Sequence, residues 1–407
     1  MARRRHLISI MAASMLLAAA SAVTARAEDF TVAGYLSWWS AADRPELFDD
    51  VAADKLTHII YAFGAIDEDG EAALADPCSE IDACDGEPQP IDASTIGIPV
   101  AGTFQRLHAL KQAHPHLKIL VAFGGWTGSA PFSSLASTAD GRARFAQSIL
   151  DVFFRPYPGL FDGVDIDWEY PVAGGLEEGT PADRENLSLL LADIREALDG
   201  FSDGDALELT VAVAASPGMI ASTYPQDLAD HVDRINVMTY DYHAGATVTN
   251  FNAPLAPIPG DPKSDANIAA SMAAWQAAGV AASKLAVGIP FYGRAFSQVS
   301  GSGDGLLRPG DPAGTDIWSG DGIAYRDLVT ARPLQQGFQV FWNEQAEVPY
   351  LYNAVEGVWI SYDNARSVAA KTEFARRQGH AGVILWELGS DDGTLLDAVG
   401  GTLSKTH

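Results

Sequence analysis

The sequence predicts an α/β fold: a (β/α)8 TIM barrel with a small domain inserted between the seventh and eighth strands. Short runs typical of buried strands recur along the chain, and helical patterns separate several of them. The eight strand runs span residues 32–38, 56–65, 118–124, 161–169, 209–215, 234–240, 285–291 and 382–386. Strands that alternate with helices are typical of a closed parallel barrel, and such barrels accommodate a chain of this length as one unit.

Helical patterns predict that helices connect several of these strands. They span residues 184–198, 265–278 and 364–378, and each ends near a glycine. The first follows Thr180 and Pro181, which read as an N-cap and a first-turn proline.

The interval between the seventh and eighth strand runs, about 90 residues, is much longer than one crossover helix needs. Residues 297–360 are rich in Gly, Asp and aromatic residues, with strand-like pieces at 337–342 and 357–361. We therefore expect an inserted domain over 297–360 within a catalytic barrel over 28–407.

The first 27 residues have the pattern of a secretory signal peptide. A basic start precedes an apolar run over residues 7–20, and Ala25-Arg26-Ala27 forms a small-x-small cleavage site. The apolar run is shorter than the roughly 20 residues that a membrane span requires. We expect a secreted protein, extracellular or periplasmic, that does not associate with a membrane.

The charge and the cysteines narrow the function further. The 53 acidic and 26 basic residues give a formal net charge of −27, which argues against nucleic acid and anionic membranes and is compatible with a neutral substrate. Cys78 and Cys84 lie close together in an acidic stretch without a histidine. In an oxidising compartment this favours a local disulfide over the alternative of a metal site.

The segment F-D-G-V-D-I-D-W-E-Y-P, residues 161–171, holds four carboxylates within eight positions. Alternation along a strand places Asp165, Asp167 and Glu169 on one face, opposite Val164, Ile166 and Trp168. Like charges so close on a half-buried face share protons, and at least one pKa rises. A raised carboxyl pKa is what a general acid needs.

Two other interpretations of these acids are possible. Oxygen ligands suit a divalent cation, but carboxylates that alternate along one strand cannot surround and coordinate an ion. Asp162, at the start of the run, is better explained as a structural hydrogen-bonding residue, and Trp168 as a core residue. The histidines show no metal-ligand spacing.

Other strand ends also carry acids beside aromatic residues. The sixth run ends in Tyr240 and Asp241, Tyr292 and Arg294 follow the seventh, and the eighth ends in Trp386. The C-terminal ends of the strands form the catalytic face of such barrels. Aromatic faces stack on sugar rings while carboxyl groups act on the glycosidic oxygen, so this composition favours a glycosidase.

The motifs resemble those of family 18 glycoside hydrolases, the chitinases. D-G-V-D-I-D-W-E is similar to the DxxDxDxE signature of that family. Six further segments occur along the chain in the order found in the family: G-Y-L-S-W-W, Y-A-F, F-G-G-W, M-T-Y-D-Y, G-I-P-F-Y-G-R-A-F and L-W-E. The resemblance covers the whole chain after the signal peptide and implies an α+β insertion domain and a chitin or chito-oligosaccharide substrate. It also implies a monomer that needs no cofactor and no metal.

The resemblance further implies a substrate-assisted, retaining mechanism. Glu169 would be the acid and base, Asp167 would turn between Asp165 and Glu169, and Tyr240 would bind the acetamido oxygen. Other residues would support Asp165 or line the groove, namely Tyr35, Phe63, Trp126, Met238, Asp241, Tyr292, Arg294 and Trp386. Core packing remains an alternative for Trp126 and Trp386, a packing role for Met238, and a surface ion pair for Arg294.

Two departures from the family pattern bear on function. Ala122 stands where a serine hydroxyl often supports the first core aspartate, and this loss predicts a shifted pH optimum. Residues 243–250 lack the tryptophan that family members commonly carry on the leaving-group side. The alternative functions are an endo-β-N-acetylglucosaminidase acting on glycoprotein glycans and a non-hydrolytic chitinase-like lectin, and the presence of Glu169 argues against the lectin.

Overall fold

The structure is a computed structural model that describes residues 30–44, 46–82, 84, 102–201, 206–301, 303–315, 318–320, 322–330 and 337–404. The segment predicted to be a signal peptide lies outside these residues. Within the described ranges, no helix combines the length and the apolar character needed to cross a bilayer.

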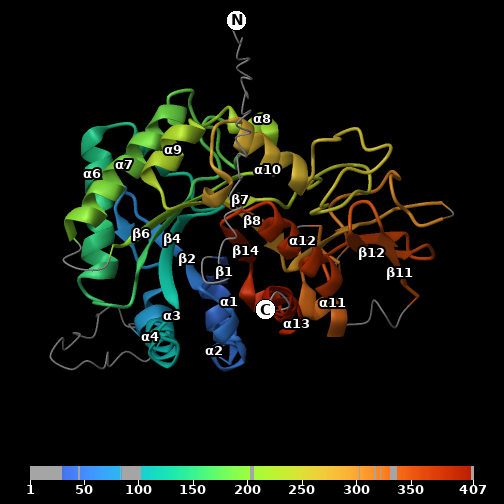
Figure 1. The fold of residues 1–407 in the computed structure, drawn as a ribbon, viewed down its shortest axis with the longest axis horizontal. Coiled ribbons are helices and arrows are strands. Elements are labelled where there is room, and N and C mark those ends of the chain that lie inside the picture. The colour runs from blue at the N-terminus through green and yellow to red at the C-terminus, as the bar shows by residue number, and fades with distance from the viewer. Residues whose placement is uncertain are drawn as a thin grey trace, which may run out of the picture.

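Eight parallel strands close into a barrel, as predicted (Figure 1). They are β1 (Thr31–Ser37), β2 (His58–Ile66), β4 (Lys118–Gly124), β5 (Gly163–Asp167), β6 (Glu208–Ala214), β7 (Arg234–Met238), β8 (Leu285–Pro290) and β14 (Gly382–Trp386). Neighbours in the ring follow chain order, and β14 pairs with β1 to close it. A two-residue strand, β3 (Ala72–Ala73), adds antiparallel to β2.

Helices follow the strands and pack around the barrel. The longer ones are α4 (Thr103–Ala113), α6 (Ala139–Ile149), α7 (Asp183–Phe201), α10 (Ile268–Ala277), α12 (Ala365–Arg377) and α13 (Thr394–Ser404). Shorter helices complete the connections, namely α1 (Trp38–Asp43), α2 (Leu47–Asp50), α3 (Pro77–Ile81), α5 (Phe132–Ala136), α8 (Pro217–Ile220) and α9 (Pro225–His231).

The helix ends follow from capping side chains. Asn364 caps α12 in a reciprocal capping box with Ser367, so that helix begins where the sequence predicts. The side chain of Asn267 accepts from the Ala270 N–H, and α10 therefore begins three residues later than predicted. Before α7, the Asp183 carboxylate accepts from the Thr180 N–H at 2.6 Å, which makes a turn that leads into the helix.

The interior of the barrel is divided into two halves. An apolar half is formed by side chains of five strands, namely Ala33, Tyr35, Ile60, Ala62, Leu120, Ala122, Ala286 and Ile384. A polar half is formed by buried side chains of β5, β6 and β7, namely Asp165, Asp167, Thr210, Arg234 and Asn236. The larger hydrophobic core lies outside the ring, between the strands and the helices.

A second sheet follows β8 in the chain and precedes β14. It is antiparallel, in the order β10 (Ile323–Ala324), β9 (Tyr292–Phe296), β13 (Val358–Ser361), β12 (Val348–Asn353) and β11 (Gln339–Asn343), and α11 (Tyr325–Thr330) follows β10. Phe251, Phe296, Tyr350 and Trp359 form an aromatic core of its own. The sheet lies at one side of the barrel, on the right in Figure 1, opposite α6 and α7.

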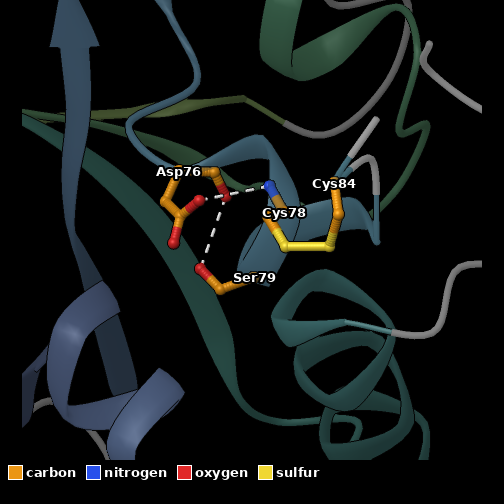
Figure 2. Close-up of a disulfide and its surroundings, with 4 residues drawn as sticks. All are labelled: Asp76, Cys78, Ser79 and Cys84. Atoms are coloured by element: carbon orange, nitrogen blue, oxygen red, sulfur yellow. Dashed lines mark hydrogen bonds between the residues drawn. A yellow bond between two sulfur atoms is a disulfide. The ribbon is translucent and has the colours of Figure 1, made fainter. Parts of the chain in front are cut away.

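The two cysteines form the predicted disulfide, which joins Cys78 in α3 to Cys84 (Figure 2). The start of α3 is fixed by Asp76, whose carboxylate accepts from the Cys78 N–H at 3.2 Å while its carbonyl accepts from the Ser79 hydroxyl at 3.3 Å. Because both sulfurs are bonded to each other, the alternative of a cysteine metal site is wrong.

Candidate active site

Strand β5 presents its acids to the barrel interior and its apolar residues to the helices, as alternation predicts. Asp165 and Asp167 are 0% and 3% exposed. Val164, Ile166 and Trp168 belong to the core outside the ring. The Trp168 ring stacks on Phe132 with 5.4 Å between centroids, which confirms its interpretation as a core residue. The acids are therefore held on a strand whose outer face is fixed by packing.

Asp165 is held by three donors from three strands. Its Oδ2 accepts from the Tyr35 hydroxyl at 2.8 Å, and its Oδ1 accepts from Asn236 Nδ2 at 3.0 Å and from the Thr210 hydroxyl. Burial raises the pKa of Asp165 above its ordinary value, and these donors together with the charge of Arg234 offset that rise only in part. The carboxylate is thus buried and fully supported, and Tyr35 lies where the resemblance places it.

Ala122 lies beside Asp165 in register on β4, and Thr210 lies beside it on β6. A hydroxyl is therefore absent on one side of Asp165 and present on the other. The expectation that Asp165 has one partner too few is corrected in this respect, because Thr210 supplies a hydroxyl from the neighbouring strand.

Asp167 has a fixed backbone and a carboxyl group with one oxygen that has no partner among the described residues. Its carbonyl accepts from the Gly125 N–H at 2.8 Å and from the Ser129 hydroxyl at 3.1 Å. Its buried Oδ1 has no hydrogen-bond partner in the described part of the chain. Burial, followed by the charges of Glu169 and Asp165, raises its pKa well above the ordinary value. A protonated carboxyl group without fixed partners can turn toward either neighbour.

Glu169 follows β5 instead of lying on it, because pairing with β4 ends at Asp167. Its N–H donates to the Ser129 hydroxyl at 2.8 Å. Burial raises its pKa to about 7, a hydrogen bond from Tyr170 opposes this shift, and the charge of Asp241 adds to it. Its side chain is only partly buried, so it combines access with the protonation state of a general acid.

Asp241 joins the end of β7 to the second sheet. Its Oδ1 accepts from the Tyr292 hydroxyl and from Arg294 Nε, each at 2.5 Å. Arg294 Nη1 also donates to the Gly320 carbonyl at 2.8 Å, and its side chain is only 17% exposed. The alternative of a surface ion pair for Arg294 therefore does not hold. The Tyr240 ring lies 6.2 Å from that of Tyr292.

Aromatic rings form a row from the end of β14 to α1. The Trp386 ring lies 5.4 Å from Tyr35 and is stacked on Phe63 at 6.0 Å, and Phe63 lies 6.4 Å from Trp39. Trp126, just beyond β4, is 50% exposed, which rules out the alternative of a core residue. Met238 is buried at the end of β7.

The interpretation of Asp162 is settled by its contacts. The Asp162 carboxylate accepts from the Ile119 N–H at 2.7 Å and pairs with Lys111 at 2.6 Å, so its role is structural as predicted. Among the described residues, no cluster of three or more acidic, histidine or cysteine side chains is arranged to hold a metal ion.

Sequence reasoning missed Thr210, Asn236 and Ser129. The first two are polar residues at interior positions of buried strands, and this pattern was visible in the runs over 209–215 and 234–240. Ser129 lies in a loop, where no periodicity points to it.

Comparisons with known proteins agree with this geometry. The family described as Glycosyl hydrolases family 18 matches residues 31–391. Chitinase A1 of Niallia circulans is 37% identical over 431 residues, which cover 95% of this chain and 60% of that protein. The chain thus spans well under the full length of this relative.

Solved structures share the fold over most of the chain. A chitinase from Bacillus thuringiensis, ChiA74, superposes with a TM-score of 0.81 at 30% identity and covers 93% of this chain and 70% of its own. A family 18 N-acetylglucosaminidase from Paenibacillus barengoltzii superposes with a TM-score of 0.75 at 31% identity. The match covers 92% of this chain and 99% of the N-acetylglucosaminidase chain. Fold, sequence and the acids of β5 together establish that the chain belongs to glycosyl hydrolases family 18.

Proposed function

We propose that this protein is a secreted chitinase that hydrolyses β-1,4 bonds between N-acetylglucosamine units. The observation that carries the proposal is the acid series along and after β5, in which a supported Asp165, an unpartnered Asp167 and a Glu169 with a pKa of about 7 follow one another. Relatives named as chitinases support the choice of substrate.

The proposed mechanism is retaining and substrate-assisted. Glu169 protonates the glycosidic oxygen, and the acetamido carbonyl of the substrate attacks its own anomeric carbon. The C–O bond to the leaving sugar breaks, and an oxazolinium ion forms. Water that gives its proton to Glu169 then opens this ion. Asp167 turns from Asp165 toward Glu169, holds the acetamido N–H and offsets the positive charge.

The remaining residues are assigned by position. Tyr240 donates to the acetamido oxygen, and Trp386 forms the apolar floor under the same sugar, since it ends β14 beside Tyr35. The others line the groove, namely Phe63, Trp126, Met238, Asp241, Tyr292 and Arg294. We assign the second sheet as the insertion domain, one wall of that groove, because Arg294 of β9 reaches Asp241 beyond β7.

A comparison of wild type with Glu169→Gln tests the proposal. Soluble sugars released from chito-oligosaccharides are measured by chromatography, and loss of the general acid lowers kcat by about 10²- to 10⁴-fold. Glu177→Gln, in the exposed loop that follows, is the matched control and retains activity. Equal activity of wild type and Glu169→Gln would refute the assignment of Glu169, and no release of sugars by wild type would favour the lectin.

The mechanism has a test of its own. A fully deacetylated chitosan oligomer lacks the acetamido nucleophile, so its cleavage is much slower than that of the acetylated chain. Efficient cleavage of the deacetylated oligomer would contradict substrate assistance.

A second candidate is an N-acetylglucosaminidase, because the Paenibacillus barengoltzii structure that bears this name matches the chain over 99% of its own length. Analysis of products from chito-oligosaccharides and from a glycoprotein with a chitobiose core distinguishes the two. Oligosaccharides from chitin indicate a chitinase, release of single N-acetylglucosamine units indicates an N-acetylglucosaminidase, and release of intact glycans indicates an endo-β-N-acetylglucosaminidase.

We also propose that the protein is exported through the segment 1–27 and acts as a monomer. Detection of the protein in the medium or periplasm with its N-terminus at residue 28, and its mass by light scattering, test these two points.

A further inference from the structure

Arg234 is a buried cation in the polar half of the barrel. It begins β7 in register with Thr210 of β6, which in turn pairs with Asp165 of β5, and it is 4% exposed. Burial of a guanidinium group is unfavourable unless charged and polar partners surround it. The residues that contact Arg234 therefore indicate which group its charge stabilises.

Arg234 is connected to Asp165 through the side chain of Asn236. Its Nε donates to Asn236 Oδ1 at 2.9 Å, and Asn236 Nδ2 donates to Asp165 Oδ1 at 3.0 Å. Because the amide oxygen of Asn236 accepts from the guanidinium group, its NH2 group must face the carboxylate. Arg234 thus fixes the orientation of the amide and polarises it toward a negative charge on Asp165.

The other charge near Arg234 already has partners. Glu208 Oε2 lies 3.9 Å from Arg234 Nη1, but this carboxylate also contacts His58 Nε2 at 3.0 Å and the Lys118 ammonium group. The remaining titratable groups that act on Arg234 or Asp165 are Tyr35, Asp167 and Asp233. Among the charged groups around it, Arg234 interacts most strongly with Glu208 and next with Asp165, and its charge lowers the pKa of Asp165.

We propose that Arg234 is a positioning residue for the glycosidase reaction, which holds Asp165 as a carboxylate through the amide of Asn236. This inference rests on the proposed function. An ionised Asp165 leaves the proton of the acid pair on Asp167, the carboxyl group that turns toward Glu169. Thr210 and Arg234 together thereby take over the support that the serine absent at position 122 would give.

The test compares wild type with Arg234→Met, which keeps the length of the side chain and removes its charge. The acidic limb of the pH profile of kcat/KM moves to higher pH by about 1 unit, since the loss of a nearby opposite charge raises a carboxyl pKa. At mildly acidic pH kcat falls about tenfold by the same shift, with little change in KM, because Arg234 does not reach the substrate. Arg234→Lys restores part of the limb.

Two controls separate this role from a structural one. Arg142→Met removes another largely buried arginine, paired with Asp193 at 2.7 Å on the outer helices, and leaves the limb unchanged. The double variant Arg234→Met/Glu208→Gln removes the whole ion pair. If Arg234 only balances Glu208, the double variant recovers the wild-type limb, and the inference is overturned.

A measurement without turnover makes the test independent of the proposed function. The destabilisation caused by Arg234→Met, from urea unfolding at several pH values, is present where Asp165 is ionised and shrinks as the pH falls through its pKa. A destabilisation that does not depend on pH, or an unchanged acidic limb, contradicts the inference. Failure of wild type to cleave chito-oligosaccharides would refute the proposed function alone.

Discussion

Ala122 and Asp165 are paired in register across β4 and β5, and the Ala122 methyl group belongs to the apolar half of the barrel interior while Asp165 begins the polar half. The boundary between the two halves therefore runs beside the first acid of the β5 series. Asp165 receives its donors from β1, β6 and β7, and none from β4.

Ala122→Ser adds a hydroxyl at this boundary. A further donor to the charged form lowers the pKa of Asp165, so the acidic limb of kcat/KM moves to lower pH by about half a unit. The shift is small because three donors are already in place. A pH-rate profile measured on chito-oligosaccharides checks this, and an unchanged profile would show that position 122 does not influence the acid pair.

The pKa of Glu169 sets the basic limb of the same profile. Since the acid must carry its proton to protonate the leaving oxygen, kcat/KM declines as the pH rises above about 7. Glu177→Gln leaves the limb in place. A basic limb near the ordinary pKa of a glutamic acid would show that burial does not tune Glu169.

Glu169→Gln makes the protein more stable at alkaline pH. A carboxyl group whose pKa rises on folding destabilises the folded state wherever it is ionised in the unfolded chain. The effect is absent below about pH 4.5, grows up to about pH 7 and then stays constant, with a size of about 3 kcal/mol. Urea unfolding at pH 4.5 and pH 8 measures it, and equal stability of the two proteins at pH 8 would count against it.

Lys371 of α12 and Asp363, which lies between β13 and α12, form an ion pair that is 0% and 1% exposed. Asp363 Oδ1 accepts from Lys371 Nζ at 2.5 Å and from the Ser367 hydroxyl at 2.6 Å. Lys371→Met leaves a buried charge without its counter-ion and costs about 3 to 5 kcal/mol of unfolding free energy. The addition of Asp363→Asn recovers part of the loss.

The matched control is the exposed pair of Arg377 and Glu373 on the same helix. Arg377→Ala costs no more than about 0.5 kcal/mol, since surface pairs contribute little. Equal losses for the two variants in urea unfolding would show that burial does not set the strength of the Lys371 pair.

Local patterns were sufficient to predict the barrel strands and the acids of β5, because alternation and strand spacing are properties of short segments. The partners of Asp165 were harder to predict, since Tyr35, Thr210 and Asn236 lie 130, 45 and 71 residues away along the chain. Only Tyr35 was anticipated, through the family resemblance. Long-range register, which no short pattern encodes, brought the other two together.

The ends of elements were also set by tertiary contacts. Glu169 has the alternation of a strand residue, but pairing stops at Asp167 and the following backbone is held by Ser129. The sequence did not predict strands β9 and β12, because neither alternates between apolar and polar residues. Nearly all their residues are buried, so neither strand has an exposed polar face.

The division of the barrel interior has a consequence for redesign. Apart from Tyr35, which donates to Asp165, the residues of the apolar half are held by packing alone, so they tolerate joint substitutions that conserve the total volume. In the polar half, Asp165, Asn236, Arg234 and Glu208 form one chain of contacts in which each side chain determines what the next one needs. We expect single substitutions at these four positions to give mostly inactive proteins. Active variants are expected mainly from libraries in which the four positions are varied together.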